Sequence, residues 1–112
     1  MAALEHTSAD DSGFHIWTAV SDGMVTMHVS GELDMDTGPQ LATHLAAHSA
    51  GRDLVVDLSA CPFIDSSGIT GLLACRQRLG PGSTMRLVGV TPSVARTLQI
   101  CGLLEVLDVA DQ

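Results

Sequence analysis

The sequence predicts one α/β domain with a mixed, largely parallel sheet, an N-terminal β-hairpin and three helices. Short apolar, β-branched segments alternate along the chain with longer amphipathic segments, and this order is typical of helices packed on a parallel sheet. The chain has 112 residues, which is the length of one domain that can bury a core without metals or disulfides. A hydrophobic content of 46% supports a folded globule.

The first half of the chain begins with strands. Residues 14–20 and 24–30 are strand-like and are separated by the turn sequence "SDG", which predicts an antiparallel hairpin. Residues 1–13 are polar and acidic and do not resemble a signal peptide. We expect them to form a flexible N-terminal tail, with the domain spanning residues 14–112.

The central part of the chain predicts two helices around a buried strand. Pro39 is placed to start a helix that ends at Gly51, after the loop 31–39. Residues 54–59, "LVVDLS", have the apolar pattern of a strand in the centre of a sheet. The helical periodicity then runs from about residue 66 to residue 79.

The C-terminal part repeats this alternation. Residues 85–90 predict a strand, followed by a helix in which Thr91 is the cap, Pro92 is the first helical residue and Gly102 is the stop. Residues 103–109 predict a last strand close to the edge of the sheet, because two acidic residues interrupt it.

Charge excludes several classes of function. The net charge is −8, from 13 acidic residues against five arginines, and there is no lysine. An acidic chain without a basic stripe is a poor binder of nucleic acid or of anionic membranes. The absence of lysine also excludes a Walker A site and Schiff-base chemistry.

The metal-ligating residues do not form a complete site. His44 and His48 lie four residues apart on a predicted helix, but the glutamate of HExxH is missing, so we expect surface histidines. The segment "DMDTG" at 34–38 departs from a calcium loop in the place of its glycine. Three cysteines, an odd number without a CxxC pair, indicate reduced thiols of a cytoplasmic protein. We expect no metal and no cofactor.

The segment "FIDSSGI" at 63–69 is the candidate for function. A serine hydrolase is disfavoured because the GxSxG elbow is absent and no base can be placed beside Ser66 or Ser67, so we expect no enzyme. Asp65, Ser66 and Ser67 are all good helix caps, but a helix needs only one. A remaining hydroxyl would be exposed at the carboxyl edge of the sheet, where the helix N-terminus accommodates a phosphoryl group.

Three motifs in register carry a family resemblance. With "GELD" at 31–34, "FIDSSGI" at 63–69 and "TPSVARTLQICGLL" at 91–104, the chain resembles the STAS domain family, specifically the bacterial anti-sigma factor antagonists. The resemblance covers nearly the whole chain from about residue 14. One departure is Thr70, where a small or apolar residue is more usual.

The resemblance implies a phosphorylation switch. A partner anti-sigma factor that is also a serine kinase phosphorylates the second serine of the motif, here Ser67, with Ser66 as the alternative acceptor. The unphosphorylated antagonist binds this kinase and frees a sigma factor, and a serine phosphatase acting on phospho-Ser67 restores binding. Transcription is then regulated without contact to DNA.

The resemblance also implies a partner-binding surface beside the phosphorylated residue. Its predicted members are Asp34, Asp36, Asp65, Ser66, Gly68 and Ile69. Two alternatives stay open. The chain can be a STAS scaffold or sensor module of a stress-signalling assembly, although such chains usually add a second domain. It can also be a small serine hydrolase that uses Ser67, which a covalent serine probe would reveal.

Overall fold

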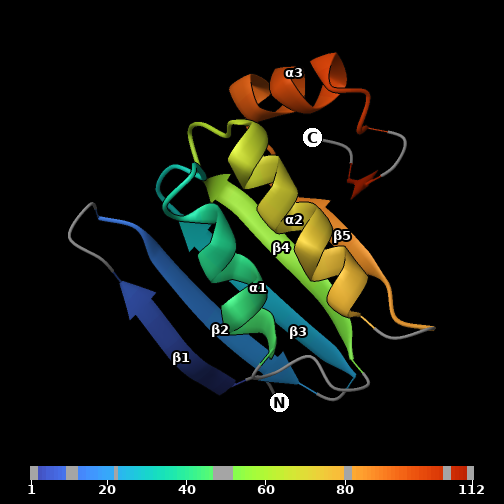
Figure 1. The fold of residues 1–112 in the computed structure, drawn as a ribbon. Helices are drawn as coiled ribbons and strands as arrows, with labels where there is room; N and C mark the ends of the chain where they lie inside the picture. The colour runs from blue at the N-terminus through green and yellow to red at the C-terminus, as the bar shows by residue number, and fades with distance from the viewer. Residues whose placement is uncertain are drawn as a thin grey trace.

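The computed structural model describes most of the chain as a sheet covered by helices (Figure 1). The described residues are 3–9, 13–21, 23–46, 52–79, 82–104 and 107–110. Among them, no helix is long and apolar enough to cross a bilayer.

A six-stranded sheet has its strands in the order in which they occur along the chain. β1–β2 and β2–β3 are antiparallel, whereas β3–β4, β4–β5 and β5–β6 are parallel. This confirms the mixed, largely parallel sheet and the predicted hairpin, which is formed by β2 and β3. The strands are β1 (Ala3–Ala9), β2 (His15–Ser21), β3 (Met24–Ser30), β4 (Asp53–Ala60), β5 (Met85–Val88) and β6 (Asp108–Val109).

The prediction of a flexible tail was wrong for residues 3–9. These residues form β1, which pairs with β2 from Ala3 opposite Val20 to Ala9 opposite His15. Without β1, one side of β2 would present unpaired backbone N–H and C=O groups. Backbone pairing satisfies these groups whatever the side chains are. A polar segment can therefore form a strand without the apolar pattern by which strands are predicted from sequence. Residues 1–2 and 10–12 lie outside the described residues.

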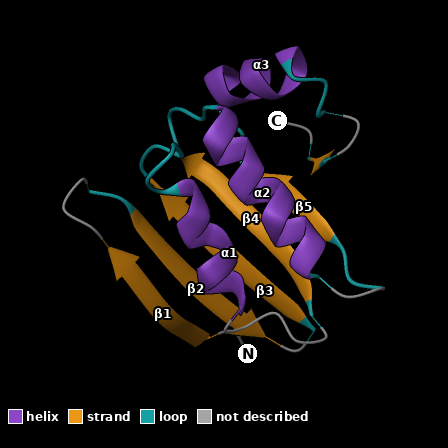
Figure 2. Ribbon diagram, in the orientation of Figure 1, coloured by secondary structure: helices purple, strands orange, loops and turns teal. Residues whose placement is uncertain are grey.

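Three helices connect the parallel strands, as predicted. They are α1 (Gly38–Ala46), α2 (Ser66–Arg78) and α3 (Pro92–Ile100). Figures 1 and 2 show α1 and α2 side by side across one face of the sheet, with α3 at the end where α2 begins. The predicted end of the first helix at Gly51 lies outside the described residues.

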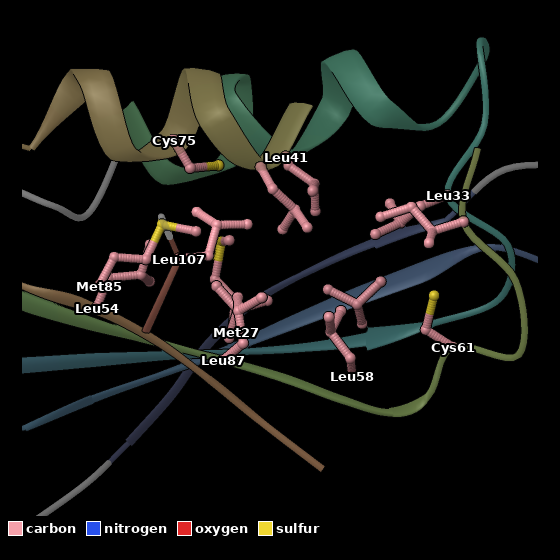
Figure 3. Close-up of a cluster of buried hydrophobic side chains, with 14 of the residues drawn as sticks. Met27, Leu33, Leu41, Leu54, Leu58, Cys61, Cys75, Met85, Leu87 and Leu107 are labelled. Atoms are coloured by element: carbon pink, nitrogen blue, oxygen red, sulfur yellow. The ribbon is translucent and has the colours of Figure 1, made fainter. Parts of the chain in front are cut away.

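The core fills the layer between these helices and the sheet. Alternate residues of β2, β3 and β4 are buried, which is the two-residue period of strands with one covered face. Figure 3 shows Leu41, Cys75 and strand residues such as Met27 meeting in this layer. Burial raises the pKa of the Cys75 thiol to about 12, so this cysteine is an inert core residue.

The residues that alternate with the buried ones on these strands are half-buried or exposed. Some of them form polar pairs. Nδ1 of His28 lies 3.0 Å from a carboxylate oxygen of Asp57. Desolvation raises the pKa of Asp57, but hydrogen bonds from Ser59 and His28 outweigh it, so the pKa lies below its usual 3.8. On the neighbouring strands, Arg86 lies 3.6 Å from Asp108.

The last strand is much shorter than the predicted 103–109. Gly102, at a φ of +73°, follows α3 in the left-handed region, and its N–H bonds to the carbonyl of Gln99. The N–H of Leu103 bonds to the carbonyl of Leu98, which completes a Schellman motif. Leu107 then bonds back to Leu103. These turns use the backbone groups that a strand would need, so pairing with β5 begins only at Asp108.

Candidate functional site

Two loops that are distant in sequence meet at the end of the sheet where α1 and α2 begin. The N–H of Leu33 donates to the carbonyl of Phe63 at 3.0 Å, and the N–H of Asp65 donates to the carbonyl of Leu33 at 3.1 Å. Leu33 and Ile64 form an isolated parallel bridge. The "GELD" loop therefore lies directly against the "FIDSSG" loop, as the resemblance implied.

Asp65 is the N-cap of α2. Its backbone is extended, and its side chain accepts a hydrogen bond from the N–H of Gly68 at 3.0 Å. Of the three candidate caps, this one is confirmed, and both serines are left in the first turn of the helix. Ser66 is exposed and Ser67 is half-buried. The cap thus frees both hydroxyl groups for another role.

Three glycines allow this end of the molecule to pack tightly. A Cβ atom on Gly38 would lie 2.7 Å from the carbonyl oxygen of Ser67, and one on Gly71 would lie 2.4 Å from the carbonyl oxygen of Gly38. A Cβ atom on Gly68 would lie 2.4 Å from the carbonyl oxygen of Leu33. Backbone atoms cannot move aside as a flexible side chain can, so these positions require glycine. They hold α1 and its preceding loop against the start of α2.

The loop from residue 31 to residue 37 has its own hydrogen bonds. A carboxylate oxygen of Asp34 accepts from the N–H groups of Asp36 and Thr37 at 2.9 and 3.1 Å. The buried Thr37 hydroxyl donates to the carbonyl of Glu32 at 2.6 Å and accepts from the N–H of Asp34. These bonds fix the loop that leads into α1. The "DMDTG" segment is thus a hydrogen-bonded turn.

The two loops and the first turn of α2 form an acidic surface. Glu32 and Asp36 are exposed, and Asp34 and Asp65 are half-buried. Residues 31–46 and 61–70 contain neither arginine nor lysine. An added phosphate would be attracted by the positive end of the α2 dipole and repelled by the neighbouring carboxylates.

The predicted partner-binding residues come together but differ in exposure. Asp34, Asp36, Asp65 and Ser66 are exposed or half-buried on adjoining loops. Gly68 and Ile69 are buried, and Ile69 is only 6% exposed. These two residues pack beneath the surface, and their accessible area is too small for much contact with a partner. Partner contact by any of these residues stays a prediction.

Two exposed apolar residues at this site are not among those predicted from the sequence. Met35 is 73% exposed in the acidic loop, and Phe63 is 45% exposed just before Ile64. Met35 stands between two aspartates in the sequence, but Leu33 in the same loop is also apolar and is fully buried, so the sequence alone does not tell the two apart.

His44 is not the surface histidine that the sequence predicted. His44 is 7% exposed, and Nε2 of its ring makes a hydrogen bond with the hydroxyl of Thr18 on β2. The prediction of a surface histidine was wrong for His44, because α1 turns this side chain toward the sheet. His48 lies outside the described residues. In the described parts of the chain, no three His, Cys, Asp or Glu side chains gather closely enough to hold a metal ion.

Comparison with known proteins extends the resemblance over most of the chain. Residues 15–112 match the family model of the STAS domain. The anti-sigma F factor antagonist of Paenibacillus polymyxa is 30% identical over 94 residues, which are 80% of each chain. The anti-sigma-B factor antagonist of Staphylococcus aureus is 28% identical over 98 residues, which are 85% of this chain and 91% of that one.

A solved structure shows the same fold. The crystal structure of an anti-sigma factor antagonist from Mycobacterium paratuberculosis is 29% identical and superimposes with a TM-score of 0.80. The match covers 94% of this chain and 92% of the other.

Proposed function

The chain belongs to the STAS domain family, and we propose that it is an anti-sigma factor antagonist that phosphorylation of Ser67 switches off. In its unphosphorylated form it binds a serine-kinase anti-sigma factor and releases a sigma factor. The kinase phosphorylates Ser67, and a serine phosphatase reverses the modification. The chain acts by binding another protein in the cytoplasm, without catalysis and without contact to nucleic acid or a membrane.

One observation carries this proposal: Ser67 lies in the first turn of α2, against the acidic loop 31–37. Its carbonyl oxygen is the atom nearest to the Cβ position of Gly38, so Ser67 lies where α1 and α2 meet. Asp65 rather than a serine caps the helix, which leaves the hydroxyl of Ser67 available. Ser66 is more exposed but lies one residue farther from this contact, and it is the alternative acceptor.

The local charges explain how a single phosphate can abolish binding. A phosphoserine adds about −1.5 to −2 charges. The first turn of α2 offers backbone N–H groups and the positive end of the helix dipole, so the modification is compatible with the fold. Two unit charges about 4 Å apart interact by about 4 kcal/mol at an effective dielectric of 20. A third of this energy would weaken the complex about tenfold.

Phosphorylation with purified proteins tests the proposal. The chain should not be labelled by ATP alone, because it has no lysine and no phosphate-binding glycine loop. With a purified anti-sigma factor kinase of the same organism and ATP, mass spectrometry should find one phosphate, on Ser67. The phosphorylated chain should lose its affinity for that kinase.

Two variants separate the serines. Ser67→Ala should stay bound to the kinase in the presence of ATP, whereas Ser66→Ala should still be phosphorylated on Ser67. A Ser67→Ala chain that is still phosphorylated and released would place the switch at another residue. Phosphorylation of Ser67 without any change in affinity would refute the switch itself.

A further inference from the structure

Five large apolar side chains are exposed in the described part of the chain. They are Met24, Met35, Phe63, Ile100 and Leu104. An isolated exposed apolar residue is common and needs no explanation. Met35 and Phe63 differ from the others because they lie on the two loops that flank Ser67, where the proposed switch operates.

Backbone contacts bring together the two loops that carry these side chains. The residue two positions before Met35 is Leu33, which bonds to the carbonyl of Phe63 itself. Three residues after Met35, Gly38 lies against the backbone of Ser67. The loop that carries Met35 is therefore attached to the "FIDSSG" segment on both sides. Met35 and Phe63 thus stand on adjoining loops at the N-terminal end of α2.

The loop presents Met35 in a fixed position. Hydrogen bonds to the carboxylate of Asp34 and to the hydroxyl of Thr37 close the turn on either side of it. Met35 is still 73% exposed, so it contributes little to the core. Because the turn is already ordered, the loop loses little conformational entropy when Met35 binds a partner. Met35 is therefore a preorganised anchor.

We infer that Met35 and Phe63 are the apolar anchors with which this chain docks onto its anti-sigma factor, and that the partner offers an apolar pocket rimmed by basic side chains. The inference rests on the proposed function. The partner's chemistry follows from complementarity. Glu32, Asp34 and Asp36 surround Met35 in the loop, so a cation-lined rim fits this surface while an acidic one is repelled. In most interfaces a few buried anchor residues contribute most of the binding energy, and a polar rim surrounds them.

The anchors also connect the surface to the switch. An apolar side chain contributes to binding only when water is excluded around it. A phosphate on Ser67 would lie in the first turn of α2, which follows the loop of Phe63 and contacts the start of α1. A complex that buries the anchors would then also have to desolvate part of a dianion. Phosphorylation would therefore oppose the docking of Met35 and Phe63 as well as repel acidic groups.

Alanine variants test the anchors, with a control that is matched in exposure. Ile100, the last residue of α3, is 75% exposed and lies outside the two loops. The dissociation constant for a purified anti-sigma factor kinase is measured by calorimetry without ATP, for the wild type, Met35→Ala, Phe63→Ala and Ile100→Ala. Met35→Ala should weaken binding by about tenfold or more, as expected for a buried anchor. Ile100→Ala should bind like the wild type.

Two further readouts distinguish the possible failures. The melting temperature of Met35→Ala should equal that of the wild type, because the side chain is exposed, and Phe63→Ala is used only if it too melts normally. The association rate should fall as NaCl is raised from about 0.05 to 0.5 M, because salt screens the acidic rim. Wild-type affinity in Met35→Ala, or an equal loss in Ile100→Ala, would overturn the inference alone. A wild-type chain that binds no anti-sigma factor would instead refute the proposed function and the inference with it.

Discussion

Replacing Gly71 with alanine should destabilise the protein and disturb the site that it supports. In a helix interior, changing glycine to alanine normally raises stability by about 0.5–1 kcal/mol, because alanine loses less backbone entropy on folding. Gly71 lies inside α2, so helix propensity alone predicts a gain. The structure predicts the opposite sign.

The magnitude follows from the contact between α1 and α2. A Cβ atom on Gly71 would lie 2.4 Å from the carbonyl oxygen and 2.9 Å from the carbonyl carbon of Gly38. Both atoms are backbone, so the start of α1 has to move away from α2. Overpacking of this kind costs about 1–3 kcal/mol. For a domain of this size, such a loss lowers the melting temperature by about 4 °C for each kcal/mol.

The assay compares Gly71→Ala with Thr70→Ala. Thr70 is the adjacent residue on the same helix and is exposed, and its hydroxyl donates to the carbonyl of Ser66. Its replacement therefore places an alanine in the same helix without the clash. Urea unfolding should show a less stable Gly71→Ala chain and a Thr70→Ala chain close to the wild type. Binding to the anti-sigma factor kinase should also weaken in Gly71→Ala, because the loop before α1 would shift from the Ser67 surface. A Gly71→Ala chain as stable as the wild type would mean that α1 and α2 do not approach this closely.

Two other predictions concern Asp65, which caps α2, and the pair that Asp57 forms with His28. Asp65→Ala should lower the free energy of unfolding by about 1 kcal/mol, and the melting temperature by about 4 °C, because it removes the cap of α2. Ser67→Ala should change both much less, and a larger shift for Ser67→Ala would show that the cap is misassigned. Asp57→Asn should cost at most about 1 kcal/mol at pH 7, as for a surface pair. Because folding lowers the pKa of Asp57 below 3.8, its stabilisation is complete above that pH and is lost as the pH falls through the folded value. Urea unfolding of the wild type and of Asp57→Asn, at neutral and at acid pH, measures this loss. A difference in the free energy of unfolding that persists in acid would contradict the prediction.

The sequence predicted much of the candidate site because its motifs are local. The cap residues at 65–67, the acidic loop and the serine in the first helical turn are all properties of a few consecutive residues. It did not predict which residue caps α2. Asp65, Ser66 and Ser67 have similar intrinsic preferences, and the choice depends on the bond between the N–H of Asp65 and the carbonyl of Leu33, which fixes where the helix begins.

By itself, the sequence determined the α/β class, the three helices, the hairpin of β2 and β3, and the caps of α3, because periodicity, propensity and capping act within one segment. Only the tertiary structure decided that residues 3–9 add a strand, that His44 turns inward to Thr18, and that Met35 stays exposed. Each of these outcomes depends on a surface built from segments far apart in the chain. A polar strand is held by the backbone of its neighbour, and a side chain is buried or exposed according to what packs over it, which no window of neighbouring residues records.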